Sequence, residues 1–396
     1  MSVFPSIRLG DCCDIVSGAT PKTGEKAYWG GEIFWVTPKD LSRLDAAYID
    51  CTPRTITELG LRSCAATLLP ARSVLFSSRA PIGHVAINTV PMATNQGFKS
   101  FVPKSDRVHP EYLLHWLRTN RSYLEGLGNG ATFKEVSKAI VSRIEVPLPP
   151  PAEQRRIAEV LDRADALRAK RRTALAQLDS LTQSIFLHMF GDPATNPKAW
   201  PRTALGRLVV NGFQNGLYKH SSHYGSGTPI LRIDAFYDGV VTGLDTLKRL
   251  RASASEIESY GLHEGDVVVN RVNSIEYLGK SAIVPFLPEP VVFESNMMRF
   301  AVDGETALAP YIVAFLQSGF IKSQIGVAAK QAVNQASINQ TDVAAFQFNI
   351  PPLSLQQTFV SRIAAINKLK TTHRTTLTEL DALFASLQHR AFRGEL

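Results

Sequence analysis

Apolar residues recur at every seventh position in two long stretches of this chain. In the first stretch, two heptad positions hold Ile157, Ala164, Leu178 and Ile185, and Val160, Leu167, Ala174 and Leu181; in the second, they hold Phe359, Ile366, Leu380 and Leu387, and Leu369 and Leu383. This period predicts two long helices, each with an apolar stripe of the kind found in coiled coils. Because a lone helix of about 35 residues is marginally stable in water, each stripe needs a partner. We therefore predict that the two helices pair with each other, antiparallel.

The same short sequence precedes both stretches. Gln154 follows Pro149-Pro150-Pro151, and Gln356 follows Pro351-Pro352. The offset is constant, since 356 − 154 = 202 and, for the leucines within the helices, 380 − 178 = 202. A fixed offset of this kind indicates that one unit occurs twice in the polypeptide.

Polar residues interrupt the two stripes at the same level. Arg171 stands in the first stripe and His373 in the second, again 202 residues apart. If the helices pack on each other, these residues form a polar layer that sets their register. The alternative is that both side chains extend along the helix surface to solvent.

Before each helix, the chain alternates short β-branched runs with turn residues and then turns helical. The strand-like runs are 33–36, 73–76 and 85–87 in the first copy and 230–233, 266–269 and 282–284 in the second; the helical patches are 110–117 and 310–316. The pattern predicts an α+β fold: two α+β domains joined by two long antiparallel coiled-coil helices, with an internal pseudo-twofold duplication. We place the first globular domain at 1–148, the first spacer helix at 149–191, the second domain at 192–349 and the second helix at 350–396.

Composition narrows the class of protein. The chain has 396 residues, a formal net charge of +8 and a sequence pI of about 9.3, which points weakly to polyanionic partners. No apolar stretch approaches the ~18 residues of a membrane span, and the N-terminal sequence does not resemble a secretory signal. The four cysteines all lie in the first copy without metal-ligand spacing, so we expect free thiols in a reducing cytoplasm.

Catalytic motifs are not apparent. Gly279-Lys280-Ser281 looks like the end of a phosphate-binding loop, but Ser274 stands where that loop needs glycine. The nine histidines are scattered, and the two copies share no His, Asp and Glu cluster. A duplicated chain with no duplicated catalytic cluster is more typical of a binding protein than of an enzyme, and we expect no catalytic residue and no metal site in this chain.

Polar loops after the strands offer chemistry suited to DNA. Arginine pairs with guanine edges, asparagine with adenine edges, and lysine and serine with phosphates. For each arginine the alternative is a surface ion pair, and for each amide a turn that binds backbone groups. The candidate DNA contacts are Lys39, Ser78, Arg79, Asn95, Lys99, Lys219, Arg232, Asn270, Arg271, Asn273, Lys280 and Arg299.

These motifs together resemble the specificity subunit of type I restriction-modification systems. The resemblance rests on the runs Phe76–Ala86, Thr94–Phe98 and Ile144–Ile157, and on the closing Phe392-Arg393-Gly394-Glu395-Leu396. It implies two target-recognition domains, each recognising one half of a bipartite site in double-stranded DNA, with the helices setting their spacing. The second copy departs from the family pattern: it has Gln356-Gln357 where Glu-Gln-Arg is expected, and no Arg-Ala-Pro-Ile-Gly run at 270–280.

The resemblance also implies partners. The helices would dock methylation subunits, which bind S-adenosylmethionine, and restriction subunits, which use ATP and Mg²⁺, would join them; this chain itself would bind no cofactor. The candidate helix seam and subunit interface comprises Ile157, Leu167, Leu178, Leu181, Ile185, Phe359, Ile366, Leu369, Leu380, Leu383 and Leu387. The alternative function is a coiled-coil scaffold or regulatory protein whose globular ends bind other proteins.

Overall fold

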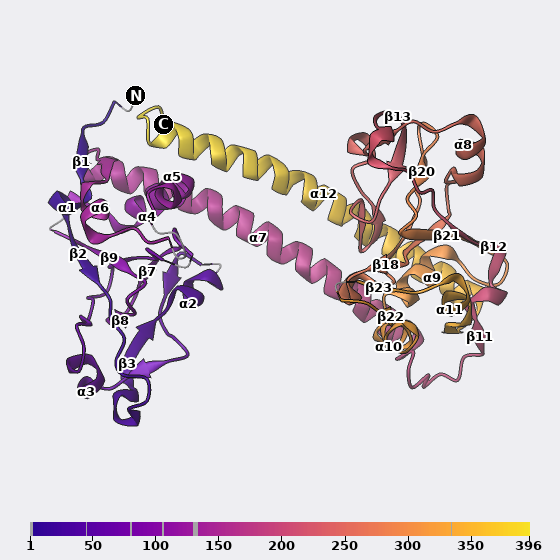
Figure 1. Cartoon of the computed structure of the whole chain (residues 1–396), viewed down its shortest axis with the longest axis horizontal. Coiled ribbons are helices and arrows are strands. Elements are labelled where there is room, and N and C mark those ends of the chain that lie inside the picture. The colour runs from indigo at the N-terminus through magenta and orange to yellow at the C-terminus, as the bar shows by residue number, and fades with distance from the viewer. Residues whose placement is uncertain (1–2, 45, 80, 105–106, 130–133, 334) are drawn as a thin grey trace. The chain divides into compact units, whose positions relative to one another are not determined.

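The computed structural model describes residues 3–44, 46–79, 81–104, 107–129, 134–333 and 335–396. Ala80, within one of the family-like runs, therefore lies outside the described residues. The chain divides into two compact units: unit 1 comprises Met1–Thr173 and His373–Leu396, and unit 2 comprises Ala174–Thr372. Each unit holds the beginning of one long helix and the end of the other (Figure 1).

Unit 1 is built on a five-stranded sheet of order β2-β9-β6-β7-β4, with a three-stranded sheet β5-β3-β8 and the pair β1-β10. The strands are β1 (Ser6–Arg8), β2 (Cys13–Ser17), β3 (Trp29–Val36), β4 (Tyr48–Ile49), β5 (Thr55–Ile56), β6 (Val74–Phe76), β7 (Val85–Asn88), β8 (Met92–Thr94), β9 (Lys99–Pro103) and β10 (Glu145–Pro147). The short helices are α1 (Leu9–Cys12), α2 (Pro38–Ser42), α3 (Glu58–Arg62), α4 (Pro110–Thr119), α5 (Arg121–Gly126) and α6 (Lys138–Arg143).

Unit 2 repeats this arrangement with additions. Its main sheet has the order β12-β21-β17-β19-β15-β14, beside the sheets β16-β13-β20 and β18-β23-β22 and the pair β11-β24. The strands are β11 (Arg202–Ala204), β12 (Val209–Asn215), β13 (Tyr224–Leu231), β14 (Phe236–Tyr237), β15 (Gly239–Val241), β16 (Arg249–Leu250), β17 (Val267–Asn270), β18 (Val272–Asn273), β19 (Ser281–Ile283), β20 (Val292–Phe293), β21 (Met297–Val302), β22 (Lys330–Gln331), β23 (Ala336–Ser337) and β24 (Gln347–Asn349); the helices are α8 (Ala254–Tyr260), α9 (Ala309–Leu316), α10 (Gly319–Ala328) and α11 (Gln340–Ala345).

Strand order confirms the duplication more strongly than the sequence does. The order β2-β9-β6-β7-β4 corresponds strand for strand to β12-β21-β17-β19-β15, and β5-β3-β8 corresponds to β16-β13-β20. Even the parallel pairs agree, because β3 runs parallel to β8 and β13 to β20. The predicted α+β class and the repeat are therefore confirmed, and unit 2 adds the strand β14 and the sheet β18-β23-β22.

The long helices are α7 (Pro151–Phe190, 40 residues) and α12 (Leu353–Ala391, 39 residues). The core of unit 1 contains Ile157 and Leu161 from the start of α7 together with Phe392, just past the end of α12. The core of unit 2 contains Phe186 from the end of α7 and Phe359 from the start of α12. The start of one helix thus accompanies the end of the other in each unit, which confirms the antiparallel pairing.

Candidate nucleic-acid interface and helix pair

The repeated glutamine fixes each long helix to the recognition fold beside it. In unit 1, Gln154 is fully buried; its Oε1 accepts the His109 amide (2.8 Å), and its Nε2 donates to the carbonyls of Arg107 (2.8 Å) and Pro149 (2.8 Å). The glutamine therefore joins the first turn of α7 to the segment that leads into α4.

Unit 2 makes the same three bonds. Gln356 is fully buried, accepts the Leu308 amide (2.9 Å), and donates to the carbonyls of Thr306 (3.3 Å) and Pro351 (2.9 Å). Leu308 immediately precedes α9, as His109 immediately precedes α4. The sequence signature that reveals the duplication is thus a hydrogen-bonded clamp, required because buried backbone groups must find partners.

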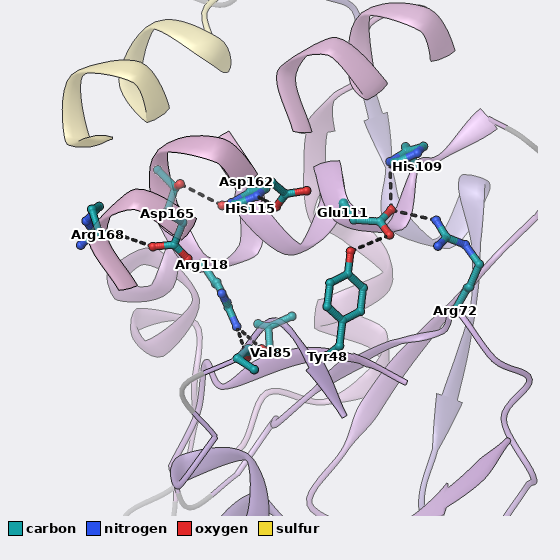
Figure 2. Close-up of polar contacts among 12 residues, drawn as sticks. Tyr48, Arg72, Val85, His109, Glu111, His115, Arg118, Asp162, Asp165 and Arg168 are labelled. Atoms are coloured by element: carbon teal, nitrogen blue, oxygen red, sulfur yellow. Dashed lines mark hydrogen bonds and ion pairs between the residues drawn. The ribbon is translucent and has the colours of Figure 1, made fainter. Parts of the chain in front are cut away.

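A polar network holds α4 in unit 1 (Figure 2). Glu111, nearly buried, accepts from the Tyr48 hydroxyl (3.1 Å) and the Arg72 guanidinium (2.8 Å), and its other close neighbour is His109 Nδ1 (3.0 Å). Burial, with the Glu111 charge as a secondary cause, raises the pKa of Tyr48 to about 12. Burial lowers the pKa of His109, which keeps its imidazole neutral at pH 7.

One turn along α4, His115 makes the direct link to the long helix. Its Nε2 lies 2.7 Å from Asp162 of α7, and its ring packs edge-on against Phe384 of α12. Arg168 of α7 also lies against Phe384, with its guanidinium carbon 4.3 Å from the ring centre. Both long helices are therefore attached to α4 within unit 1.

Unit 2 makes the corresponding attachment with aromatic rings. Ala314 stands at the His115 position when Tyr311 is matched to Tyr112, both of which donate to a carbonyl of the strand before the long helix. In place of the polar network, Phe186 packs within 6.0 Å, centre to centre, on the rings of Phe190, Tyr311, Phe315 and Phe359. The fold is therefore duplicated, but the contacts that join it to the long helices are polar in unit 1 and aromatic in unit 2.

The predicted polar layer is present. Arg171 Nη1 lies 2.9 Å from His373 Nδ1, so the two residues contact each other. In the rest of unit 1, Arg168 Nε bonds to Asp381 (2.5 Å); in unit 2, Lys370 bonds to Asp179 (2.7 Å) and Thr182 (3.2 Å). The structure therefore confirms the interpretation that Arg171 and His373 form a polar layer between the helices.

The candidate seam residues separate into buried and exposed groups. Ile157, Phe359 and Ile366 are buried, and Leu178, Ile185, Leu380 and Leu387 are partly buried. The remaining four are about half exposed: Leu167 (54%), Leu181 (45%), Leu369 (51%) and Leu383 (50%). We name these four the exposed leucines. They form two repeat-related pairs, since 369 − 167 and 383 − 181 both equal 202.

The structure places the DNA-contact candidates of unit 1 mainly around one carboxylate. Arg79 (3.8 Å) and Lys99 (3.2 Å) both pair with Glu135, and Lys99 is largely buried. Ser78 is buried and donates to the Gly97 carbonyl (3.1 Å), and the Asn95 side chain accepts the Gly97 amide (2.9 Å). Lys39, on α2, is exposed and lies outside this group.

In unit 2 the cationic candidates also have partners within the unit. Lys219 pairs with Glu256 (2.7 Å), Arg232 with Glu294 (3.5 Å) and Arg299 with Asp266 (3.1 Å), while Arg271 donates to the Ser295 carbonyl (3.0 Å). Lys280 donates to the Ile233 carbonyl (2.5 Å) and lies 3.9 Å from the Tyr237 ring centre; burial lowers its pKa.

The two asparagine candidates of unit 2 differ in burial, because Asn273 is only partly buried. Asn270 is fully buried, and Asn273 accepts the Ser274 amide (2.8 Å). Sequence reasoning selected charged residues near strand ends and missed their carboxylate partners, such as Glu135, which lies far along the chain from Arg79. It also passed over the loop that follows β2, and in the loop that follows β12 it selected only Lys219, although a glycine, Gly18 or Gly216, begins each loop and marks the correspondence.

In the part of the chain that the structure describes, no three His, Cys, Asp or Glu side chains are grouped to hold a metal ion. Over the same residues, no helix is both long and apolar enough to cross a membrane.

Comparison with known proteins gives the class. The family model described as the type I restriction modification DNA specificity domain matches residues 2–178 and 214–382, one match for each repeat. The chain therefore belongs to this family, whose role is the DNA sequence specificity of type I restriction-modification.

Particular relatives agree with this assignment. The type I restriction enzyme MjaIX specificity subunit of Methanocaldococcus jannaschii is 31% identical over 74% of this chain and 72% of its own length. The EcoKI specificity subunit of Escherichia coli K12 is 25% identical over 81% of this chain and 73% of its own length.

Two solved structures share the fold. An S subunit from M. genitalium aligns with a TM-score of 0.59 at 12% identity, covering 98% of this chain and 96% of its own. A chain from a study of assembly and conformational transition in the type I R-M system aligns with a TM-score of 0.56 at 19% identity, covering 99% of this chain and 98% of its own.

Proposed function

We propose that this chain is the non-catalytic specificity subunit of a type I restriction-modification complex, in which each unit recognises one half of a bipartite DNA site. The observation that supports the proposal best is a duplicated scaffold whose exposed chemistry has diverged. The strand order and the glutamine clamp repeat, whereas the loops and the attachments to the helices do not. Recognition of two different half-sites requires this combination of a shared backbone fold and different side chains facing the DNA.

In such a complex, other subunits would carry out the methylation and restriction reactions. Methylation subunits would bind S-adenosylmethionine and modify adenine, restriction subunits would use ATP and Mg²⁺, and this chain would supply recognition alone. The test is reconstitution with methylation subunits and genome-wide mapping of methylated adenine. Replacing the unit 2 recognition fold with that of a relative should change one half of the methylated motif and leave the other half intact. Methylation of an unchanged motif would refute the assignment.

A scaffold function makes the opposite prediction for DNA. A specificity subunit bound to its methylation subunit should shift DNA in an electrophoretic assay, sequence-selectively and more weakly as salt rises. No shift at low salt would instead support a protein that binds only other proteins.

The exposed leucines are the surfaces that we propose for methylation subunits. Half-exposed leucines on long helices are typical of sites where a partner helix packs, and their repetition at the same offset suits two copies of one partner. Leu167→Ala with Leu383→Ala, both in unit 1, should remove one methylation subunit from the complex, as measured by native mass spectrometry. Thr173→Ala, an exposed change on α7, is the matched control. Full occupancy in the double variant would contradict this assignment.

The spacing role also has a direct test. Because Gly191 adopts a left-handed conformation just after the end of α7, an insertion there would enter the linker rather than the helix. Seven residues should therefore be inserted into both helices beside the Arg171–His373 contact, so that the pair stays in register. Each helix lengthens by about 10 Å, so the preferred gap between half-sites should grow by up to about 3 base pairs. An unchanged gap between the half-sites would refute the proposal that the two helices set the spacing.

A further inference from the structure

The charged residues expected to contact DNA are mostly neutralised within their own units. Arg79 and Lys99 share Glu135, and Lys219, Arg232 and Arg299 each have a carboxylate partner. A cation held in such a pair must give up its carboxylate before it can bind a base edge. Exposed polar side chains on rigid backbone, at equivalent places in the two units, do not have to break such a pair.

One such place in unit 1 is the loop after β2. We define residues 19–24 as recognition loop 1. Gly18 precedes it, where an added Cβ would overlap the carbonyl oxygens of Thr94 and Asn95, so only glycine permits this crossing. The Ala19 amide donates to the Thr94 carbonyl (3.0 Å), which fixes the start of the loop against the turn before β9.

Two tryptophans fix the rest of the loop backbone. Trp35 Nε1 donates to the Ala19 carbonyl (3.0 Å), and Trp29 Nε1 donates to the Lys22 carbonyl (3.2 Å). The two rings pack edge-to-face at 5.0 Å, and Arg54 stacks 4.0 Å from the Trp29 ring centre. The two indole N–H groups hold the loop carbonyls, and the Lys22 side chain is exposed to solvent.

Unit 2 builds the same crossing. We define residues 217–223 as recognition loop 2. An added Cβ at Gly216 would overlap the carbonyls of Phe293 and Glu294, and the Leu217 amide donates to Phe293 (2.7 Å) as the Ala19 amide does to Thr94. The Lys219–Glu256 pair ties this loop to α8 and holds the pKa of Glu256 at about 2.

The side chains on the two loops differ in kind. Beside loop 1, the Gln96 side chain is exposed and accepts the Thr20 hydroxyl through Oε1, while its amide N–H₂ has no partner among the described residues. On loop 2, next to the hydrogen-bonded Leu217, Tyr218 is 77% exposed. An oriented glutamine amide suits the N6 and N7 edge of adenine, whereas a tyrosine offers a ring and one hydroxyl.

We propose that recognition loop 1 with Gln96, and recognition loop 2 with Tyr218, are the specificity-determining contacts of the two half-sites. This inference rests on the proposed function. The equal backbone crossings place the loops in the same position of each fold, and the unequal side chains give each unit its own base preference. Arg79 and Lys99 instead form the pair with Glu135 that supports the turn behind loop 1.

The test uses the full complex with methylation subunits, radiolabelled methyl donor and duplexes that carry every single-base change of the wild-type motif. Gln96→Ala should raise methylation of sites altered in one half by about tenfold relative to the cognate site, because losing one amide–base contact relaxes selection at that base. Tyr218→Ala should relax only the other half. Lys170→Ala, an exposed change on α7, is the control and should leave every ratio unchanged.

The outcomes separate this inference from the function on which it rests. A wild-type complex with no sequence preference would refute the proposed function itself. A selective wild type, with Gln96→Ala and Tyr218→Ala as selective as Lys170→Ala, would overturn the loop assignment alone. So would an Arg79→Ala variant that relaxes the motif more than Gln96→Ala does. Because both side chains are exposed, we expect each variant to fold. An unchanged circular dichroism spectrum excludes unfolding as the cause of a change in selectivity.

Discussion

Replacing the buried glutamine of unit 1 by leucine should destabilise that unit and not the other. Gln154→Leu retains most of the side-chain volume but leaves three backbone groups without their present partner: the His109 amide and the carbonyls of Arg107 and Pro149. Because the side chain is fully buried, water cannot replace these bonds without opening the contact between α7 and the recognition fold.

The expected magnitude follows from the three lost bonds. An unsatisfied buried polar group costs about 1–3 kcal/mol, so the three together should cost at least about 3 kcal/mol. For a domain of this size, that corresponds to a drop of roughly 6–12 °C in Tm. Gln177→Leu makes the same exchange at an exposed site of α7 and should cost less than about 0.5 kcal/mol.

Hydrogen–deuterium exchange is the suitable assay, because two units in one chain do not unfold as a single two-state system. Under denaturant, amides of β6 and α4 report on unit 1, and those of β17 and α9 on unit 2. Gln154→Leu should lower protection in the first group only, and Gln356→Leu in the second only. If Gln154→Leu behaved like Gln177→Leu, the glutamine would not be a clamp, and its repetition would need another explanation.

Three further predictions concern the helix pair and unit 1. Asp179→Ala should cost about 3 kcal/mol of unfolding free energy in unit 2, because it leaves the buried Lys370 ammonium without a carboxylate partner, whereas Lys370→Met should stay within about 1 kcal/mol. Equal losses of amide protection in unit 2, measured by hydrogen–deuterium exchange, would be contrary to this. His373→Arg should place two guanidinium groups together at the Arg171 level and lower the Tm more at low salt than at high salt; a salt-independent change would exclude charge repulsion. Because the pKa of Tyr48 is raised in the folded state, its hydroxyl ionises at a lower pH in the unfolded chain than in the folded one. The stability of unit 1 should therefore fall as pH rises from about 10 towards 12. Tyr48→Phe should reduce this pH dependence, measured by thermal unfolding across the same range.

The long helices and the duplication could be predicted because their signals are dense and regular. A seven-residue period sustained over five turns or more leaves few alternatives, and the offset of 202 repeats at the proline, glutamine and leucine positions. The contact between Arg171 and His373 followed as one of two interpretations, since the two residues are repeat equivalents and such equivalents can meet only at the centre of an antiparallel pair.

The candidate site was harder to predict because ion pairs join distant parts of the chain. Nothing near Arg79 or Lys99 in the sequence identifies Glu135 as their shared partner, and nothing near Arg299 identifies Asp266. Whether Asn270 lies inside or outside also depends on how β17 sits within its sheet. Residue type alone suggested DNA chemistry at these positions, while exposure, which decides availability, came only with the fold.

The helix contacts show how duplication constrains what can follow it. In an antiparallel pair of repeated helices, a residue can face its own repeat equivalent at one level only, and every other contact must occur in two related copies. Arg171 and His373 are such equivalents, and Arg168–Asp381 in unit 1 has its counterpart in Lys370–Asp179 in unit 2, because 168 + 202 = 370 and 381 − 202 = 179. At the paired copies, opposite charges can be kept unchanged after duplication. At the self-facing level two arginines would place like charges together, whereas an imidazole nitrogen can accept from the guanidinium of the other copy.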